Sequence, residues 1–334
     1  MKKNILLALC ISLSAYNLYA QSNDSARVNS PSGENLMDML NDIPPAAASS
    51  VVKKPKKEMV YNTFGGTHLI NGQTTETINK KTMAFIISHR FGSVKAGGWR
   101  DFFGLDQASM RMSFEYGILD NLSIGASRST FEKTYDFYTK YRFVDQKKKG
   151  MPFSMALYAD MAINSLKWQD PSRKNYFTSR MSYAFQLIMA RKFNEYFSFQ
   201  LTPTVTHFNL VATSADPNTV FSLGMGFKVK ASKRLSLLAE YYRNINDNKN
   251  NGYNKDIFAI GLDVVTGGHV FQFQITNAQA MYESGFLRRT TGNFWKGDIH
   301  IGFNISRTWG VGKDAKAERK EKRAKKKAAQ KGKE

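Results

Sequence analysis

The sequence predicts an all-β fold: a closed antiparallel transmembrane β-barrel of about twelve strands, with a disordered N-terminal lead-in and a basic C-terminal tail. Apolar and polar residues alternate with a period of two along most of the chain. Many of these runs reach the roughly 9 to 11 residues that a tilted strand needs to cross a bilayer. The mean hydropathy of -0.42 agrees, because lipid-facing and lumen-facing residues of such strands average out.

Residues 1–20 have the three parts of an export signal. Lys2-Lys3 precede a short apolar run from Ile5 to Leu13, and Leu18-Tyr19-Ala20 suits cleavage before Gln21. We therefore expect a signal peptide at 1–20, because the apolar run is shorter than the roughly 20 residues of a membrane-spanning helix.

The only cysteine of the chain, Cys10, lies inside this predicted signal peptide. Leu9 precedes it, whereas lipid attachment would need a small residue there. The mature chain is then free of thiols, which excludes disulfides and thiol chemistry.

Polar segments flank the predicted barrel domain of residues 61–309. Residues 21–60 read as a flexible periplasmic lead-in, in which the apolar spacing at 33–41 leaves open a helix of one or two turns. Residues 310–334 form the basic tail, in which eleven Lys or Arg face four Asp or Glu from Lys313 onward. The tail thus contributes part of the net charge of +21. We expect no nucleic-acid partner, and the tail reads as a solvated extension or as a contact for acidic periplasmic surfaces.

Twelve runs have the alternation expected of barrel strands. In the clearest, Phe271, Phe273 and Ile275 face one way and the intervening polar residues the other. The runs lie near 82–91, 107–117, 121–129, 134–144, 152–163, 176–191, 196–210, 219–230, 234–244, 254–265, 269–277 and 297–309.

Long and short links alternate between these runs, as in membrane barrels with short periplasmic turns and longer external loops. An even strand number places both chain ends on one side. We therefore expect a barrel in the outer membrane of a Gram-negative-type bacterium, with periplasmic termini. Its partners would be outer-membrane lipid and, because the last strand ends at Trp309, the barrel-assembly machinery.

Strand alternation turns ten charged residues toward the lumen. Twelve strands lie between filled eight-stranded barrels and open porins of about 16 strands, which predicts a narrow or plugged pore. The charges form either an internal salt-bridge network, which we favour, or a site for a small solute, with Lys140, Arg142 and Arg180 directing a preference for anions. The candidates are Arg90, Arg111, Glu115, Asp136, Lys140, Arg142, Asp160, Arg180, Glu240 and Asp263.

Two other functions stay open. A non-conducting scaffold or surface-binding barrel would use its Asn-rich and Tyr-rich loops, such as 244–255. A membrane-embedded hydrolase would need one of His89, His207 or His300, but no serine lies in a G-x-S-x-G motif. We expect no catalytic residue, no cofactor and no metal site, since neither H-x-x-x-H nor H-E-x-x-H occurs.

Six short motifs in order resemble one family. They are Thr63-Phe64, Leu69-Ile70-Asn71-Gly72-Gln73, His89-Arg90-Phe91-Gly92, Phe102-Phe103-Gly104-Leu105-Asp106, Lys133-Thr134-Tyr135-Asp136 and Gly302-Phe303-Asn304-Ile305-Ser306-Arg307. Across residues 60 to 309 the chain resembles the domain of unknown function 5777 family, uncharacterised β-barrels of Bacteroidetes-type bacteria. The resemblance implies a barrel and brings no catalytic residues.

Overall fold

The computed structural model describes residues 58–60, 62–168, 170–172, 174–246, 255–266 and 268–312. The predicted signal peptide (1–20), the lead-in up to residue 57, the helix expected at 33–41 and the tail from residue 313 lie outside the described residues.

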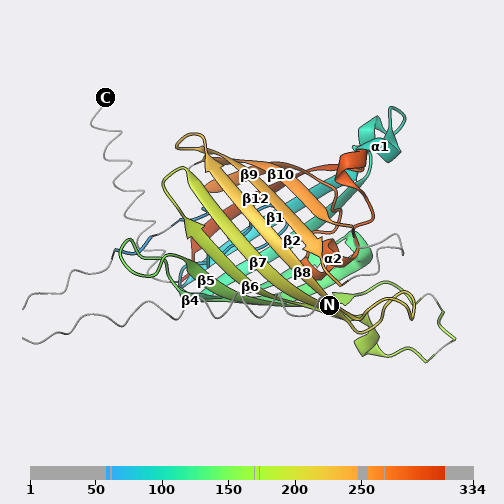
Figure 1. Ribbon diagram of the computed structural model, residues 1–334. Coiled ribbons are helices and arrows are strands. Elements are labelled where there is room, and N and C mark those ends of the chain that lie inside the picture. Colours follow the sequence, from blue (N-terminus) through green and yellow to red (C-terminus); the bar gives the residue numbers. More distant parts are fainter. Residues whose placement is uncertain are drawn as a thin grey trace, which may run out of the picture. The chain divides into compact units, whose positions relative to one another are not determined.

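Twelve antiparallel strands form one closed barrel (Figure 1). Each strand pairs with its neighbours in the sequence, and β1 closes the barrel by pairing with β12. The strands are β1 Thr82–Ser93, β2 Ala108–Leu119, β3 Leu122–Ser129, β4 Thr134–Val144, β5 Ser154–Asn164, β6 Met181–Lys192, β7 Phe197–Phe208, β8 Thr219–Lys230, β9 Leu235–Asn244, β10 Ile257–Thr266, β11 His269–Thr276 and β12 His300–Gly310.

The predicted barrel and all twelve predicted strands are confirmed, with differences only at strand ends. Strand β6 begins at Met181 instead of near residue 176, because Phe177–Arg180 form a 3-10 helix. Strand β12 begins at His300 because Gly297 has a left-handed φ of 82° after the turn Phe294–Lys296.

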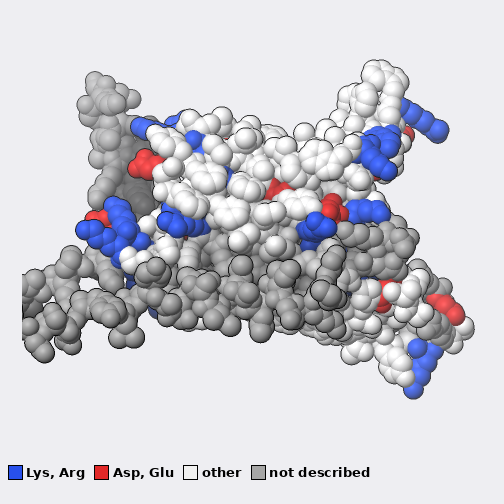
Figure 2. All heavy atoms as spheres, viewed as in Figure 1, with Lys and Arg blue, Asp and Glu red and all other residues white. Residues whose placement is uncertain are grey.

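The two faces of the wall differ as the alternation predicts. On β4, Tyr135, Phe137 and Tyr141 are exposed on the outside, whereas Asp136 and Lys140 are buried inside. Figure 2 shows Lys and Arg gathered near the two ends of the barrel, with a mostly uncharged face between them. An apolar outer band of this kind suits a bilayer.

Short turns connect the strands at one end of the barrel and long links at the other (Figure 1). Among the described residues, the links at this second end carry the short helices: α1 Val94–Gly97, η1 Phe102–Gly104, η2 Phe131–Lys133, η3 Phe177–Arg180, α2 Glu283–Arg288 and η4 Phe294–Lys296. None of the helices among the described residues has the length and apolarity needed to cross a membrane.

The segment before β1, residues 62–80, runs inside the barrel, and we call it the plug. Most of its side chains from Thr63 to Ile78 are buried, although the segment contains no strand. The lumen is therefore filled by chain as well as by wall side chains.

The end of the predicted lead-in is paired instead of free. The amide of Val60 donates to the carbonyl of Gln146 at 2.9 Å, and the amide of Lys148 donates to the carbonyl of Glu58 at 3.0 Å. Residues 58–60 thus hold the β4–β5 turn, because Met59 also forms a bridge with Lys147.

Candidate functional site

The plug folds as a tight hairpin around Asn71-Gly72, a sequence that favours turns. The Leu69 amide donates to the Gly72 carbonyl at 2.8 Å, and the Thr74 amide donates to the Thr67 carbonyl at 3.0 Å. The Thr74 hydroxyl also donates to the carbonyl of Gly66 at 2.6 Å. These bonds give the plug a defined shape of its own.

A single carboxylate on the wall holds the tip of this hairpin. Glu240, buried on β9, accepts backbone N–H groups from Ile70 at 3.2 Å, Asn71 at 2.8 Å and Gly72 at 3.3 Å. Hydrogen bonds to an ionised group are stronger than neutral ones. Glu240 is therefore a main anchor of the plug.

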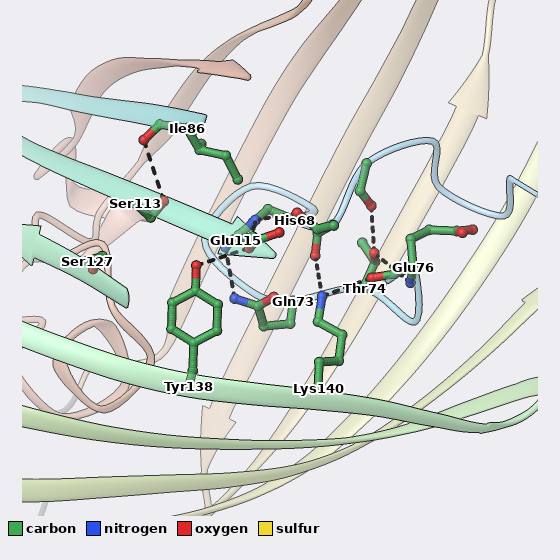
Figure 3. Close-up of polar contacts among 12 residues, drawn as sticks. His68, Gln73, Thr74, Glu76, Ile86, Ser113, Glu115, Ser127, Tyr138 and Lys140 are labelled. Carbon is green, nitrogen blue, oxygen red and sulfur yellow. Dashed lines mark hydrogen bonds and ion pairs between the residues drawn. The ribbon is translucent and has the colours of Figure 1, made fainter. Parts of the chain in front are cut away.

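Basic side chains of the wall donate to plug carbonyls and amides. Lys140 Nζ donates to the carbonyls of Thr67 at 2.8 Å and Glu76 at 3.1 Å (Figure 3). Arg90 Nη2 donates to Asn71 Oδ1 at 2.8 Å. These plug oxygens are acceptors that replace the water that would otherwise solvate the two cations.

Side-chain amides of the barrel wall also bind the plug. Gln200 Nε2 on β7 donates to the carbonyl of Gln73 at 2.7 Å. Gln272 Nε2 on β11 donates to the Leu69 carbonyl at 2.5 Å, and Asn304 Nδ2 on β12 donates to the Ile70 carbonyl at 3.2 Å. The plug is thus bonded to strands around the barrel, not to one side of it.

One face of the plug is apolar. Phe64, Leu69 and Ile70 are buried in a cluster with the wall residues Ala190 and Leu238. Small wall residues leave room for the chain, since a Cβ built on Gly226 would lie 2.5 Å from a Leu69 methyl carbon.

The long link between β11 and β12 fills the lumen from the end of the barrel that has the long links. All six residues of α2 are buried, with Phe286 and Leu287 packed against Tyr242 and Ile257 of the wall. Gln73 Nε2 of the plug donates to Glu283 Oε1 of α2 at 2.6 Å. The link and the plug therefore meet inside the barrel.

Eight of the ten charged residues predicted to face the lumen are buried on the inner side of the wall. The nearest opposite charges pair tightly, as Arg111 Nη2 lies 2.5 Å from Asp136 Oδ2. The eight are Arg90, Arg111, Glu115, Asp136, Lys140, Asp160, Glu240 and Asp263.

Of the other two, Arg142 also lies on the inner side of β4 but is less buried, and Arg180 lies in an outer loop. Arg142 is half-buried near the short-turn end, with its guanidinium 3.7 Å from Glu76 Oε2 and 2.8 Å from Asp145 Oδ1. Arg180 departs from the predicted lumen position, because it ends the 3-10 helix before β6. Its guanidinium donates to the Asn164 carbonyl at 3.0 Å and lies 3.8 Å from the Trp168 ring centroid. It stabilises an outer loop.

His68 belongs to the plug, not to a membrane-spanning strand, and its ring is enclosed. Gln73 Nε2 lies 2.8 Å from His68 Nε2, and Glu115 Oε1 lies 3.7 Å from His68 Nδ1 (Figure 3). Burial lowers the pKa of His68 well below its ordinary value, and the cations Lys140 and Arg111 lower this pKa further. The docked imidazole is therefore neutral at neutral pH.

A cavity of about 310 Å³ with a mixed polar and apolar lining remains beside the plug at the short-turn end. Its lining combines plug residues with ends of neighbouring strands, among them Gly66, Thr77, Thr266, Ser306 and Thr308. The plug thus leaves a vestibule on that side.

The three histidines considered for hydrolysis have ordinary strand contacts. The His89 ring stacks on Phe303 with centroids 4.9 Å apart. His207 Nδ1 lies 2.8 Å from Thr219 Oγ1, and His300 Nδ1 lies 2.9 Å from the Phe91 carbonyl. Within the described ranges, no group of three or more His, Cys, Asp or Glu side chains is placed to hold a metal ion.

Sequence reasoning predicted a narrow or plugged pore, but it did not identify residues 62–80 as the plug or the α2 link as an inward segment. The Asn71-Gly72 turn was visible, but it stands outside any alternating run. The link had a clearer signal, because Ala278, Ala280, Met281, Phe286 and Leu287 make it unusually apolar for an exposed loop.

A closed barrel with an apolar outer band and a polar interior is the architecture of a membrane-spanning β-barrel. The chain belongs to the domain of unknown function 5777 family, whose model, described as a membrane-bound β-barrel domain, matches residues 64–309. The predicted family resemblance is confirmed.

The chain is similar to several solved structures at low sequence identity. The chain is similar to the KdgM porin, with 8% identity, a TM-score of 0.41, and coverage of 69% of this chain and 99% of that one. It is similar to the COG4313 outer membrane channel from Pseudomonas putida F1, with 10% identity, a TM-score of 0.44, and coverage of 70% and 98%. Outer membrane phospholipase A from Escherichia coli gives 10% identity, a TM-score of 0.37, and coverage of 67% and 89%. No curated protein matches the sequence.

Proposed function

We propose that this protein is a non-enzymatic outer-membrane channel for a small solute, gated by its own plug. The observation that carries the proposal is a polar, charged lumen wall closed by a chain segment that is held mainly by hydrogen bonds. Water can replace such bonds when the segment leaves, so the exposed wall would be hydrated.

The wall beneath the plug is suited to an aqueous path. Lys140 and Lys228 donate to the plug carbonyls of Thr67 and Phe64, so plug release would free these cations into the lumen. A permanently closed scaffold needs no such charges, because apolar filling of similar volume is as stable as a buried charge network or more so.

The membrane orientation of the proposal follows from the plug. The plug joins β1 at the short-turn end of the barrel, where the Lys80 amide donates to Asp120 of the β2–β3 turn. A signal peptide at 1–20 would deliver the chain to the periplasm, where the barrel-assembly machinery would insert it. The junction of the plug with β1 and a solvated basic tail would then face the periplasm, with outer-membrane lipid around the wall.

Two glycines of the plug offer a matched test of gating. A Cβ on Gly72 would lie 1.8 Å from the Tyr242 hydroxyl, a buried side chain packed on Phe286, whereas a Cβ on Gly66 would meet its nearest atom at 3.7 Å. Gly72→Ala should therefore dislodge the plug, and Gly66→Ala should not.

Planar-bilayer recording of refolded protein measures the difference. We expect rare openings for the parent and for Gly66→Ala, and a larger open probability for Gly72→Ala. Equal open probabilities for the two variants would contradict plug gating, and no current from any of them would favour a non-conducting barrel.

The open channel should prefer anions, because Lys140 and Arg142 are on the inner side of β4 near the plugged end. Fixed positive charge in a low-dielectric wall concentrates anions. Arg180, bound to loop carbonyls, is excluded from this role. The reversal potential across a salt gradient should move toward zero in a Lys140→Ala and Arg142→Ala double variant, and an unchanged potential would assign both charges to structure.

A further inference from the structure

A group of buried polar side chains between the wall and α2 lacks partners. Neither carboxylate oxygen of Asp160 on β5 has a hydrogen-bond partner, and neither polar atom of the Gln186 amide on β6 has one. Both side chains are 3% exposed. Burying a polar group without a partner is costly, and an unpaired carboxylate is the costliest case.

These residues lie together on one patch of the inner wall. Tyr158 stands directly opposite Gln186 in the β5–β6 register, and Asp160 follows Tyr158 by two residues on the same face. Asp160 is opposite Ala184, whose methyl side chain offers the carboxylate no hydrogen bond.

Helix α2 brings a second carboxylate to this patch. The hydroxyls of Ser182 on β6 and Ser284 on α2 are 2.9 Å apart, which fixes the neighbouring Glu283 against the wall. Glu283 Oε1 accepts from Gln73, and the Tyr158 hydroxyl lies beside the same carboxylate, whose Oε2 is left without a hydrogen bond of ordinary length. Tyr158 and Asp160 both lie within electrostatic reach of Glu283.

The local charge is not balanced. The nearest guanidinium, Arg111, is engaged by Asp136 at 2.5 Å, and Lys140 is bonded to plug carbonyls. In the part of the chain that the structure describes, no Lys, Arg or His forms an ion pair with Asp160 or Glu283. Asp160 and Glu283 thus lie within electrostatic reach of one another, and among the described residues the one cation within reach of both, Arg111, is already paired with Asp136.

We propose that Asp160, Glu283 and Gln186, with Tyr158 beside them, form a binding site for a hard divalent cation of the Ca²⁺ class. The donors are carboxylate, amide and phenolic oxygens, which suit Ca²⁺ because it takes six to eight oxygen ligands in flexible geometry, with water filling the remainder. The site has only two carboxylates, and its other ligands are neutral oxygens. It is therefore outside the groups of three or more His, Cys, Asp or Glu considered above.

A cation at this position would join three parts of the molecule. It would connect the β5–β6 wall to α2 and, through the 2.6 Å bond from Gln73 to Glu283, to the plug. The site does not depend on whether the barrel conducts, because its effect is on binding and thermal stability.

Calcium titration of the full-length protein tests the site. Folded protein in detergent is treated with a chelator, and Ca²⁺ binding is measured by calorimetry, with Tb³⁺ luminescence sensitised by nearby tyrosine as a second readout. We expect one saturable site per chain and a rise in Tm with Ca²⁺.

Three variants decide the assignment. Asp160→Asn and Glu283→Gln should each weaken Ca²⁺ binding at least about tenfold and remove the Tm response. The control is Asp263→Asn, a buried acid on β10 that already accepts from Gln272 at 2.8 Å, and it should bind as the parent does. The two variants lie on different elements, so Glu283→Gln on α2 remains informative if Asp160→Asn does not fold.

Absence of saturable binding by the parent at millimolar Ca²⁺ would overturn the proposal. So would parent-like affinity in both variants. A higher Tm for Asp160→Asn, with no Ca²⁺ response in the parent, would show that a proton and not a cation neutralises the patch.

Discussion

Replacement of Glu240 by Gln tests the strongest anchor of the plug. The carboxylate accepts three backbone N–H groups, from Ile70, Asn71 and Gly72. Glutamine keeps one acceptor oxygen, and its NH₂ group faces donors to which it cannot bond. At least one buried N–H group of the plug then loses its partner.

The size of the effect follows from that lost partner. A buried donor without a partner costs about 1–3 kcal/mol. Because about 1.4 kcal/mol is a factor of ten, the docked-to-undocked ratio of the plug should fall roughly 5- to 150-fold. The barrel itself should stay folded, since the strand ladders on both sides of β9 do not use this side chain.

A cysteine on the plug reports docking. Thr75 is buried, and cysteine is close to it in size, so Thr75→Cys in a Cys10→Ser background should label slowly with a water-soluble thiol reagent. When opening and closing are fast, the labelling rate follows the undocked population. Adding Glu240→Gln should raise this rate by the factor above.

The matched control is Thr206→Ala on β7, which removes a buried wall hydroxyl that donates to the Val220 carbonyl at 3.3 Å and does not touch the plug. It should leave the labelling rate unchanged. A rate for Glu240→Gln within twofold of its parent would refute the assignment of Glu240 as an anchor.

Three further predictions use other parts of the chain. Below about pH 6.5 the His68 imidazole of an undocked plug binds a proton, whereas the docked, buried imidazole does not. The rate of plug labelling should therefore rise by up to about tenfold per pH unit as the pH falls. The His68→Gln variant should show a flatter pH profile. Identical profiles would exclude His68 as the titrating group. Phe273 is 57% exposed on the outer face, so Phe273→Arg should cost about 2–4 kcal/mol of barrel stability at mid-membrane. The folded fraction, measured by heat-modifiable gel mobility, should fall for Phe273→Arg and not for the control Phe273→Leu. Equal folded fractions for the two variants would contradict a lipid-facing position. Cysteines at exposed Arg100 and Lys233 should react oppositely with an impermeant reagent, the first on intact cells and the second only after the outer membrane is broken, and the reverse result would invert the barrel.

The strands of the barrel wall were predictable because the alternation of apolar and polar residues can be recognised within each short stretch of sequence. Phe271, Phe273 and Ile275 on one face and Gln272 and Gln274 on the other specify a strand without reference to any partner. The same periodicity identified Asp136 and Lys140 as inward residues. Each of these inferences needs only nearest neighbours in sequence.

The contents of the lumen were not predictable in this way. Nothing local indicates that Glu240 binds the backbone of residues 70–72, because the contact joins positions about 170 apart in the chain. The plug lacks a period, since its conformation is fixed by donors from many strands. The prediction for Arg180 was wrong for a different reason. The alternating pattern of β6 was extended back to residue 176, whereas Phe177–Arg180 form a 3-10 helix and the strand begins at Met181.

The most direct test of the account is the conductance of a barrel that lacks residues 62–78, compared with the full-length protein in planar bilayers under the same salt and voltage. Folding of the shortened barrel is verified first by heat-modifiable gel mobility. Closure by the plug predicts a steady current through the shortened barrel and rare, brief openings of the full-length protein. Equal currents through the two folded proteins would contradict the claim that residues 62–80 close the lumen.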